Sequence, residues 1–262
     1  MSDLKFFEVF FGFLFGASFG SFANVLIYRM PAGESLFPAS RCSKCGTPVK
    51  WYHNIPMVSY FLLKGKCAQC GQPFSVRYPL VEFLMAILFA AVLYVYGTSW
   101  TTLEYLIMVF GLVTASFIDY DHMILPDEIT LGGLAIALIG AALNPERDFL
   151  EAVYGVLFGG CILWLVAYVY FVITGRDGLG GGDIKLLAWL GALLGWKSIP
   201  FIILSSSIIG SVVGLLTARK GEDGLKTMIP FGPFLALGAV LYIFGLKSVG
   251  VWYIDLFFPS FN

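Results

Sequence analysis

One short stretch of this chain places an acid and a base at the start of a hydrophobic segment. It runs from Gly178 to Lys185, contains four glycines, and puts Asp183 and Lys185 just before the apolar run that begins at Leu186. Glycine lets the backbone pass close to a substrate, and an ionisable group beside apolar residues is a functional candidate. A solvated acid at a helix start would give the same pattern. A catalytic interpretation therefore needs a second acid.

Asp119 is that second acid, because it directly follows the apolar run 103–118. Two carboxylates close together cannot both ionise easily, so one keeps its proton. The ionised partner can take a proton from water while the protonated one stabilises the oxyanion that develops on a peptide carbonyl. Asp119 and Asp183 are thus candidates for the catalytic pair of an aspartic protease. Two independent helix-terminal acids, or an acid pair that moves protons or ions in a transporter, are the alternatives.

Four cysteines form two pairs with the spacing of a metal site. Cys42 and Cys45 form one C-x-x-C pair, and Cys67 and Cys70 form the other. Such turns each point two sulfurs at one ion, which predicts a four-thiolate zinc site. Four thiolates leave no open coordination position, so we expect zinc to be structural, closing a segment that has no core of its own. Two disulfides are the alternative, which a cytoplasmic location disfavours.

The composition is that of an integral membrane protein. Of the 262 residues, 58% are hydrophobic and 13% charged, and the mean hydropathy is +0.84. The net charge of -1 argues against a nucleic-acid partner, because phosphate binding needs a basic surface. We predict an all-α polytopic membrane protein with a small cytoplasmic four-cysteine zinc-binding domain. About eight transmembrane helices are expected, over residues 6–28, 79–97, 103–118, 129–143, 150–173, 184–195, 199–217 and 230–247.

The distribution of Lys and Arg predicts the orientation in the bilayer. The loop between the first two spans is rich in both residues, which indicates a cytoplasmic loop. With eight spans, a polar loop at 219–227 lies on the same side, and four basic residues lie on the opposite side: Lys5, Arg147, Lys197 and Lys247. Asp119 and Asp183 are then both expected at the cytoplasmic face.

These motifs occur in an order that resembles the type 4 prepilin peptidase family over nearly the whole chain. The matching segments are Gly20–Arg29, the four paired cysteines, Arg77–Glu82, Asp119–Asp127, Gly180–Leu186 and Ile229–Pro233. In that family the acid after the third span and the acid of the G-x-G-D motif are the catalytic pair. The resemblance therefore assigns catalysis to Asp119 and Asp183.

The resemblance implies two reactions at the inner membrane of a bacterial cell. One removes the short basic leader of type 4 prepilins and pseudopilins on the cytoplasmic side. The other N-methylates the newly exposed residue with S-adenosylmethionine. The sequence has no nucleotide-binding fingerprint. With the resemblance, we expect the region 29–82 and nearby helix ends to form the donor site, with Glu82 and Gly65 as candidates.

The expected division of the chain follows from these assignments. Residues 1–28 form the first transmembrane helix, 29–78 the cytoplasmic zinc-binding domain associated with methyl transfer, and 79–262 the helical membrane protease domain. The rival function is a proton- or ion-coupled transporter that uses the same acidic pair. Such transporters show repeated hydropathy halves, and the sequence has no such repeat.

Overall fold

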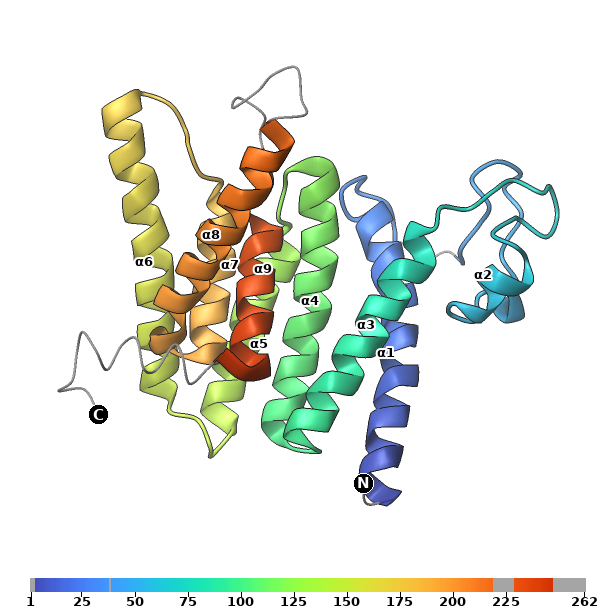
Figure 1. Cartoon of the computed structure of the whole chain (residues 1–262), viewed down its shortest axis with the longest axis horizontal. Coiled ribbons are helices and arrows are strands. Elements are labelled where there is room, and N and C mark those ends of the chain that lie inside the picture. Colours follow the sequence, from blue (N-terminus) through green and yellow to red (C-terminus); the bar gives the residue numbers. More distant parts are fainter. Residues whose placement is uncertain (1–2, 38, 219–228, 247–262) are drawn as a thin grey trace. The chain divides into compact units, whose positions relative to one another are not determined.

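The computed structural model describes residues 3–37, 39–218 and 229–246, and its regular elements there are helices (Figure 1). In chain order they are α1 (Asp3–Arg29), the short α2 (Val58–Leu62), α3 (Arg77–Tyr96), α4 (Trp100–His122), α5 (Asp127–Leu143), α6 (Phe149–Thr174), α7 (Gly181–Leu194), α8 (Ile199–Ala218) and α9 (Gly232–Leu241). A π-helical turn, η4 (Tyr242–Leu246), continues α9. The polar loop expected at 219–227 and Lys247 lie outside the described residues.

Each of the eight predicted spans coincides with a helix. Five helices, namely α1, α3, α4, α6 and α8 with the turn before it, are long and apolar enough to cross a membrane. The shorter α5, α7 and α9 contain 17, 14 and 10 residues.

The helix that contains the third predicted span is longer than that span, because α4 continues to His122 and includes Asp119. The helix stops only where Met123 adopts a left-handed backbone conformation, with φ of 56°.

The chain forms two compact units, of which unit 1 ends at Thr114 and unit 2 begins at Ala115. Within unit 1, α1 packs against α3 through small residues. A Cβ added at Gly16 would lie 2.7 Å from the Met85 carbonyl oxygen, and one at Gly20 would lie 2.5 Å from the Cα of Glu82. Asn24 of α1 donates to the carbonyl oxygen of Tyr78 at 3.0 Å. Small residues of α1 thus let the two helices approach closely, and Asn24 links them by a hydrogen bond.

Within unit 2, α7 is the central helix. Almost every residue from Leu186 to Leu193 is buried. A Cβ at Gly155 of α6 would overlap the carbonyl oxygen of Gly191 of α7, and the reverse is also true, so only glycine permits this helix contact. Asp183 therefore lies in the first turn of a helix that is surrounded by other helices of unit 2.

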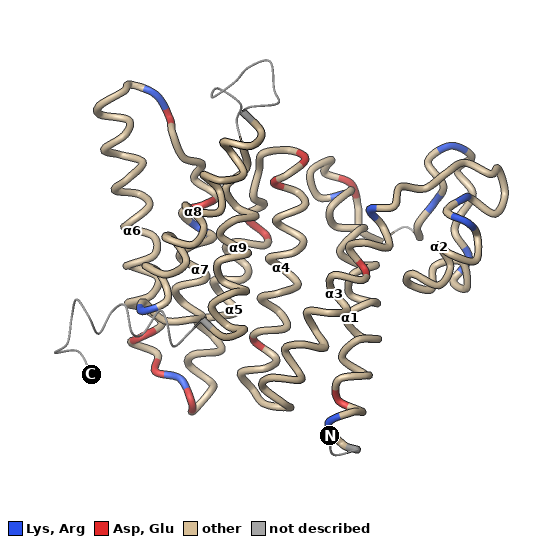
Figure 2. Tube along the Cα trace, in the orientation of Figure 1, with Lys and Arg blue, Asp and Glu red and all other residues tan. Residues whose placement is uncertain are grey.

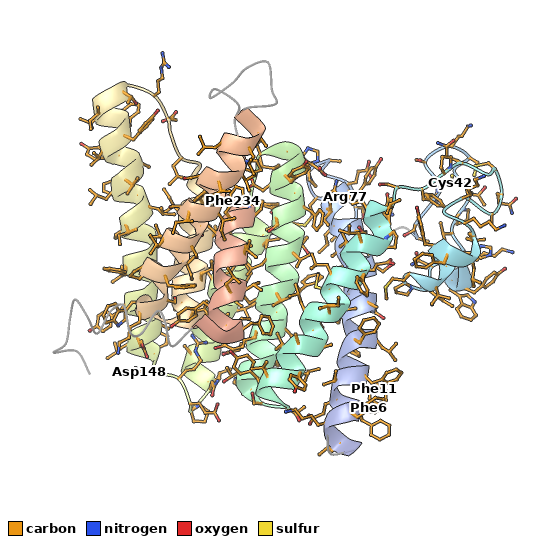
Figure 3. All side chains as sticks on the ribbon, viewed as in Figure 1. Phe6, Phe11, Cys42, Arg77, Asp148 and Phe234 are labelled. Carbon is orange, nitrogen blue, oxygen red and sulfur yellow. The ribbon has the colours of Figure 1, made fainter. Side chains whose placement is uncertain are left out.

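The outer faces of the helices carry large apolar side chains. Phe6 and Phe11 on α1 are 54% and 60% exposed, and Figure 3 shows both near the N-terminal end of that helix. Lys and Arg instead gather on the segment between α1 and α3 (Figure 2). Unit 1 thus has an apolar helical surface suited to lipid and a polar segment suited to water.

Candidate active site and metal centre

The ends of α4 and α7 bring Asp119 and Asp183 together within unit 2. Asp119 lies in the last turn of α4 and Asp183 in the first turn of α7. Their residues are only 6% and 7% exposed. The charge of Asp119 acts on the carboxyl group of Asp183, so the two are electrostatic neighbours. The arrangement is a buried carboxylate pair formed by two helices that are far apart in the sequence.

The two carboxyl groups differ in how they are held. The backbone N–H of Gly232, at the start of α9, donates to Oδ2 of Asp119 at 3.0 Å. A Cβ at position 232 would lie 2.7 Å from that oxygen, so a side chain there would disturb the contact. In the described part of the chain, no group hydrogen-bonds the buried Oδ1 of Asp183. The backbone of Gly180 also hydrogen-bonds the carboxyl group of Asp183, so both acids are held, but Oδ1 of Asp183 is available to a reacting molecule.

The segment after α4 completes the wall of the site. Leu125 lies against the starts of both α7 and α9: a Cβ at Gly182 would be 2.8 Å from its Cβ, and one at Gly232 would be 3.1 Å from its Cδ2. This apolar side chain helps to exclude water from the carboxyl groups. A low-dielectric environment strengthens electrostatic interactions at a reacting carbonyl.

An ion pair joins α5 to α7 beside the aspartates. Lys185 Nζ lies 2.6 Å from Oδ1 of Asp127, and the two side chains are 39% and 56% exposed. Asp127 begins α5 directly after Pro126. Exposed pairs of this kind stabilise a protein by about 1 kcal/mol at most. This ion pair thus contributes little to stability and does not include the buried acids.

In unit 1 the four predicted zinc ligands converge. The sulfur atoms of Cys42, Cys45, Cys67 and Cys70 all lie within 4.8 Å of one another. Cys42, labelled in Figure 3, is buried in the segment beside α2. Its Sγ lies 3.7 Å from that of Cys70. Ligands at the usual Zn–S distance of about 2.3 Å in a tetrahedron are roughly 3.8 Å apart, so the spacing fits zinc.

The two cysteine pairs belong to turns of the same construction. In the first, Cys42 N–H donates to Thr47 O at 3.0 Å and Gly46 N–H donates to Cys42 O at 2.9 Å. In the second, Cys67 N–H donates to Gln72 O at 2.8 Å and Gly71 N–H donates to Cys67 O at 3.0 Å. Gly46 and Gly71, each after the second cysteine of its pair, have φ of 68° and 69°, a left-handed conformation that glycine adopts without strain.

Local hydrogen bonds favour the thiolate form of Cys45 and Cys67, whereas the neighbouring cysteines help to raise the pKa of Cys70 to about 11. Bonds to the side chain and backbone of Thr47 lower the pKa of Cys45 to about 6. Backbone bonds from Cys70 and Gln69 lower the pKa of Cys67. Clustered thiolates repel one another, and a divalent cation removes that repulsion. The donor set therefore fits a structural zinc ion.

A cavity of about 730 Å³ lies within unit 1 and contains both candidate donor-site residues. Its wall comes from the end of α1, the start of α3 and the segment between them. Glu82 is 7% exposed, and its Oε2 accepts from Met57 N–H at 2.7 Å. Gly65 has φ of 65°, and a Cβ there would lie 2.9 Å from the ring of Tyr60. Glu82 therefore lies on the wall of this cavity.

Sequence reasoning missed Gly232 and Met57 as partners of the acids. Met57 has φ of 59°, an uncommon conformation for a non-glycine residue, and nothing in its sequence neighbourhood signals that its N–H would face α3. Gly232 lies between Phe231 and Pro233 in a proline-rich helix entry, and that entry is the only available signal. Both contacts depend on tertiary packing.

Comparison with protein-family models accounts for most of the chain. Residues 14–96 match the model described as the bacterial peptidase A24 N-terminal domain. Residues 106–215 match the model described as the type IV leader peptidase family. The chain belongs to the type IV leader peptidase family. The first match includes both cysteine turns and Glu82, and the second includes Asp119 and Asp183.

Curated relatives in this leader peptidase family align along most of their length. A protein from Pseudomonas putida is 39% identical over 85% of each chain. One from Aeromonas hydrophila is 35% identical over 94% of this chain and 93% of its own, and one from Neisseria gonorrhoeae is 38% identical over 96% of each. All three are named prepilin leader peptidase/N-methyltransferase. No solved structure matches this chain.

Proposed function

We propose that this chain cleaves the basic leader from type 4 prepilins and pseudopilins and then N-methylates the new N-terminal residue. The observation that carries the peptidase activity is the buried pair of Asp119 and Asp183, with one oxygen of Asp119 held by Gly232 N–H. Family membership and the names of the relatives support both activities. They also favour this function over the transporter alternative.

In the peptidase reaction the two acids take different roles. Asp119 acts as the general base, because Gly232 N–H stabilises its ionised form and its negative charge favours the presence of the proton on the neighbouring Asp183. It takes a proton from the attacking water. Asp183 carries the shared proton, and its Oδ1 donates a hydrogen bond to the scissile carbonyl as negative charge develops on the oxygen. The proton that Asp119 took from water then passes to the leaving amine. The aspartate pair thereby returns to its starting state, with one shared proton.

The methyltransferase activity is assigned to unit 1. S-Adenosylmethionine, when bound, supplies an electrophilic methyl group. The region 29–82 is proposed to hold it, with Glu82 and Gly65 on the wall of the cavity. Cys42, Cys45, Cys67 and Cys70 are proposed to bind a structural Zn²⁺ that keeps the intervening segment folded. The cavity volume of about 730 Å³ is within the usual range of small-molecule sites.

The proposed location is the inner membrane of a bacterial cell, with the zinc-binding segment and the active site facing the cytoplasm. The basic residues between α1 and α3 favour this orientation. A prepilin has a basic leader followed by an apolar helix, so its scissile bond lies near the same membrane boundary. The proposed partners are therefore membrane-inserted prepilins and pseudopilins in the lipid bilayer.

Mass spectrometry of a synthetic prepilin tests the proposal. The purified protein in detergent is incubated with the substrate, with and without S-adenosylmethionine. We expect loss of the leader in both samples, and a further gain of one methyl group only when the donor is present. An intact substrate in both samples would contradict the peptidase assignment, and cleavage with no methyl gain would contradict the methyltransferase assignment.

A further inference from the structure

The cavity in unit 1 contains one deeply buried carboxylate that the peptidase reaction does not use. Among the described residues lining it, the carboxylates are Glu82 and the exposed Glu34. Oε2 of Glu82 accepts from Met57 N–H, and Ser21 also hydrogen-bonds the carboxyl group. Both of these donors are neutral, and a carboxylate is costly to bury unless its charge meets a complementary group. A buried acid on a cavity wall therefore points to a cationic or proton-donating ligand.

The backbone around Glu82 is shaped to hold this acid in place. Met57 has φ of 59° and donates to the acid from the residue that precedes α2. From the other side, Gly20 of α1 brings its backbone against the Cα of Glu82. Uncommon backbone conformations that persist in a fold are concentrated at functional sites. The position of the carboxyl group is thus fixed by three separate segments of unit 1.

The rest of the wall suits a methyl donor. Tyr28, Tyr60 and Tyr78 line the cavity, and aromatic rings attract cationic groups such as a sulfonium. Arg41 and Lys66 also line it and can pair with a carboxylate of the donor. The cavity therefore offers aromatic and cationic groups for the donor and one buried anion for a different partner.

We propose that this cavity is where methyl transfer takes place and that Glu82, a candidate for the donor site, instead binds and deprotonates the acceptor amine. The inference rests on the proposed methyltransferase function and deepens it. Transfer requires a neutral amine, whereas a free N-terminus is largely protonated at neutral pH, with a pKa of about 7.7–8.0. Glu82 pairs with the ammonium group of the cleaved substrate and accepts one of its protons.

The transfer itself then balances without another reactant. The lone pair of the amine forms the new N–C bond as the methyl carbon leaves the sulfonium sulfur. The C–S bonding electrons stay on sulfur, which becomes a neutral thioether. The secondary amine that forms carries the positive charge until it releases a proton to solvent, and the proton on Glu82 also passes to solvent when the product leaves.

The test uses the full-length protein in detergent and a peptide that begins with the mature N-terminal phenylalanine, so cleavage is not required. Glu82→Gln keeps an oxygen for Met57 N–H but loses the charge. We expect methyl transfer to fall about 100-fold, which is within the range for general-base catalysis. Affinity for the free-amine peptide should fall about 10- to 100-fold, whereas affinity for the N-acetylated peptide stays the same. Affinity for S-adenosylmethionine, zinc content and prepilin cleavage should match those of the wild type.

Controls separate this role from a structural one. Glu8→Gln changes a carboxylate at the start of α1, which accepts from Thr98 Oγ1 at 2.7 Å, and should leave all these quantities unchanged. Glu82→Asp retains the charge and should recover part of the free-amine preference. Wild-type methylation by Glu82→Gln would overturn the inference, as would loss of donor affinity with an unchanged peptide preference. A wild-type protein that transfers no methyl group would instead contradict the proposed function itself.

Discussion

The aspartate site in unit 2 and the cysteine-rich segment in unit 1 hold their functional groups by different means. Asp183 lies on α7, a helix that is buried almost throughout and packed against α6 through Gly155 and Gly191. Between α1 and α3, by contrast, the described residues form only the short α2, a 3-10 turn and two matched cysteine turns. Helix packing therefore positions the acids, whereas local turns and a metal ion shape the wall of the cavity. This difference predicts that the two proposed activities can be lost separately.

The largest expected effect comes from either member of the acid pair. Asp119→Asn or Asp183→Asn removes a proton-transfer group, so leader cleavage should fall by at least about 1,000-fold. Zinc content should not change, because the ligands belong to unit 1. Mass spectrometry of the peptide products and metal analysis measure the two quantities. Asp121→Asn and Asp177→Asn, which change nearby exposed acids, are matched controls expected to cleave normally. Cleavage by the Asp183→Asn protein would refute the pair.

Substitution of a metal ligand should instead abolish zinc binding and methylation while leaving cleavage intact. Cys42→Ser removes one of four thiolates and should reduce bound zinc to near zero, because the remaining donors hold the ion weakly. Methylation should fall with it, while cleavage by unit 2 persists. Cys161→Ser changes an exposed cysteine on α6 and should leave zinc bound. A Cys42→Ser protein that retained a full zinc content would contradict the four-cysteine site.

Lowering the pH should weaken metal binding by the four cysteines. The lowered pKa values of Cys45 and Cys67 mean that these thiols lose their protons more easily in the folded chain than in the unfolded chain. Their contribution to stability is therefore present at alkaline pH and is lost as the pH falls through about 6 for Cys45. A chelator should remove zinc faster at pH 6 than at pH 8. Equal rates of release at both values would show that thiol protonation does not compete with the metal.

A smaller change in unit 2 tests the anchoring of Asp119. In Gly232→Ala the added Cβ would lie 2.7 Å from Oδ2 of Asp119, so the acid or α9 must shift. We expect cleavage to fall about 10- to 100-fold, since small misplacements of catalytic groups have effects of this size. Methylation of an already mature peptide should not change. Unaltered cleavage would mean that the contact between Gly232 and Asp119 has no role in positioning the acid.

The smallest effect is expected at the exposed ion pair. Lys185→Met or Asp127→Asn breaks a contact between half-exposed side chains, which is worth about 1 kcal/mol or less. Cleavage should fall by less than about fivefold, and the double variant should resemble either single variant. A loss as large as that for Asp183→Asn would place Lys185 among the groups that act on the substrate.

Much of this organisation could be predicted from the sequence because its signals are local. Apolar runs locate the helices, and the C-x-x-C pairs with their glycines predict turns that the structure confirms. The end of α4 was harder to predict from the sequence, because Asp119 is polar. Only the backbone conformation of Met123 shows where the helix stops. Polarity alone is a poor guide to the end of a helix when the acid is buried in a functional site.

The contacts that distinguish the acids could not be predicted in the same way. Gly232 is 113 residues from Asp119, and Met57 is 25 residues from Glu82. Each donates a backbone N–H, which every residue except proline possesses, so residue type carries no information about the contact. Only the packing of α9 in unit 2 and the conformation of Met57 in unit 1 determine which amide meets which carboxyl group.

We assign cleavage to the acids of unit 2 and methyl transfer to the cavity of unit 1. The most direct test is methylation of a mature, pre-cleaved peptide by the Asp183→Asn protein. We expect this protein to fail to cleave a prepilin yet to transfer a methyl group to the mature peptide at the wild-type rate. Loss of both activities, in a protein with a full complement of zinc and normal donor affinity, would show that the two reactions share one site and would contradict the account.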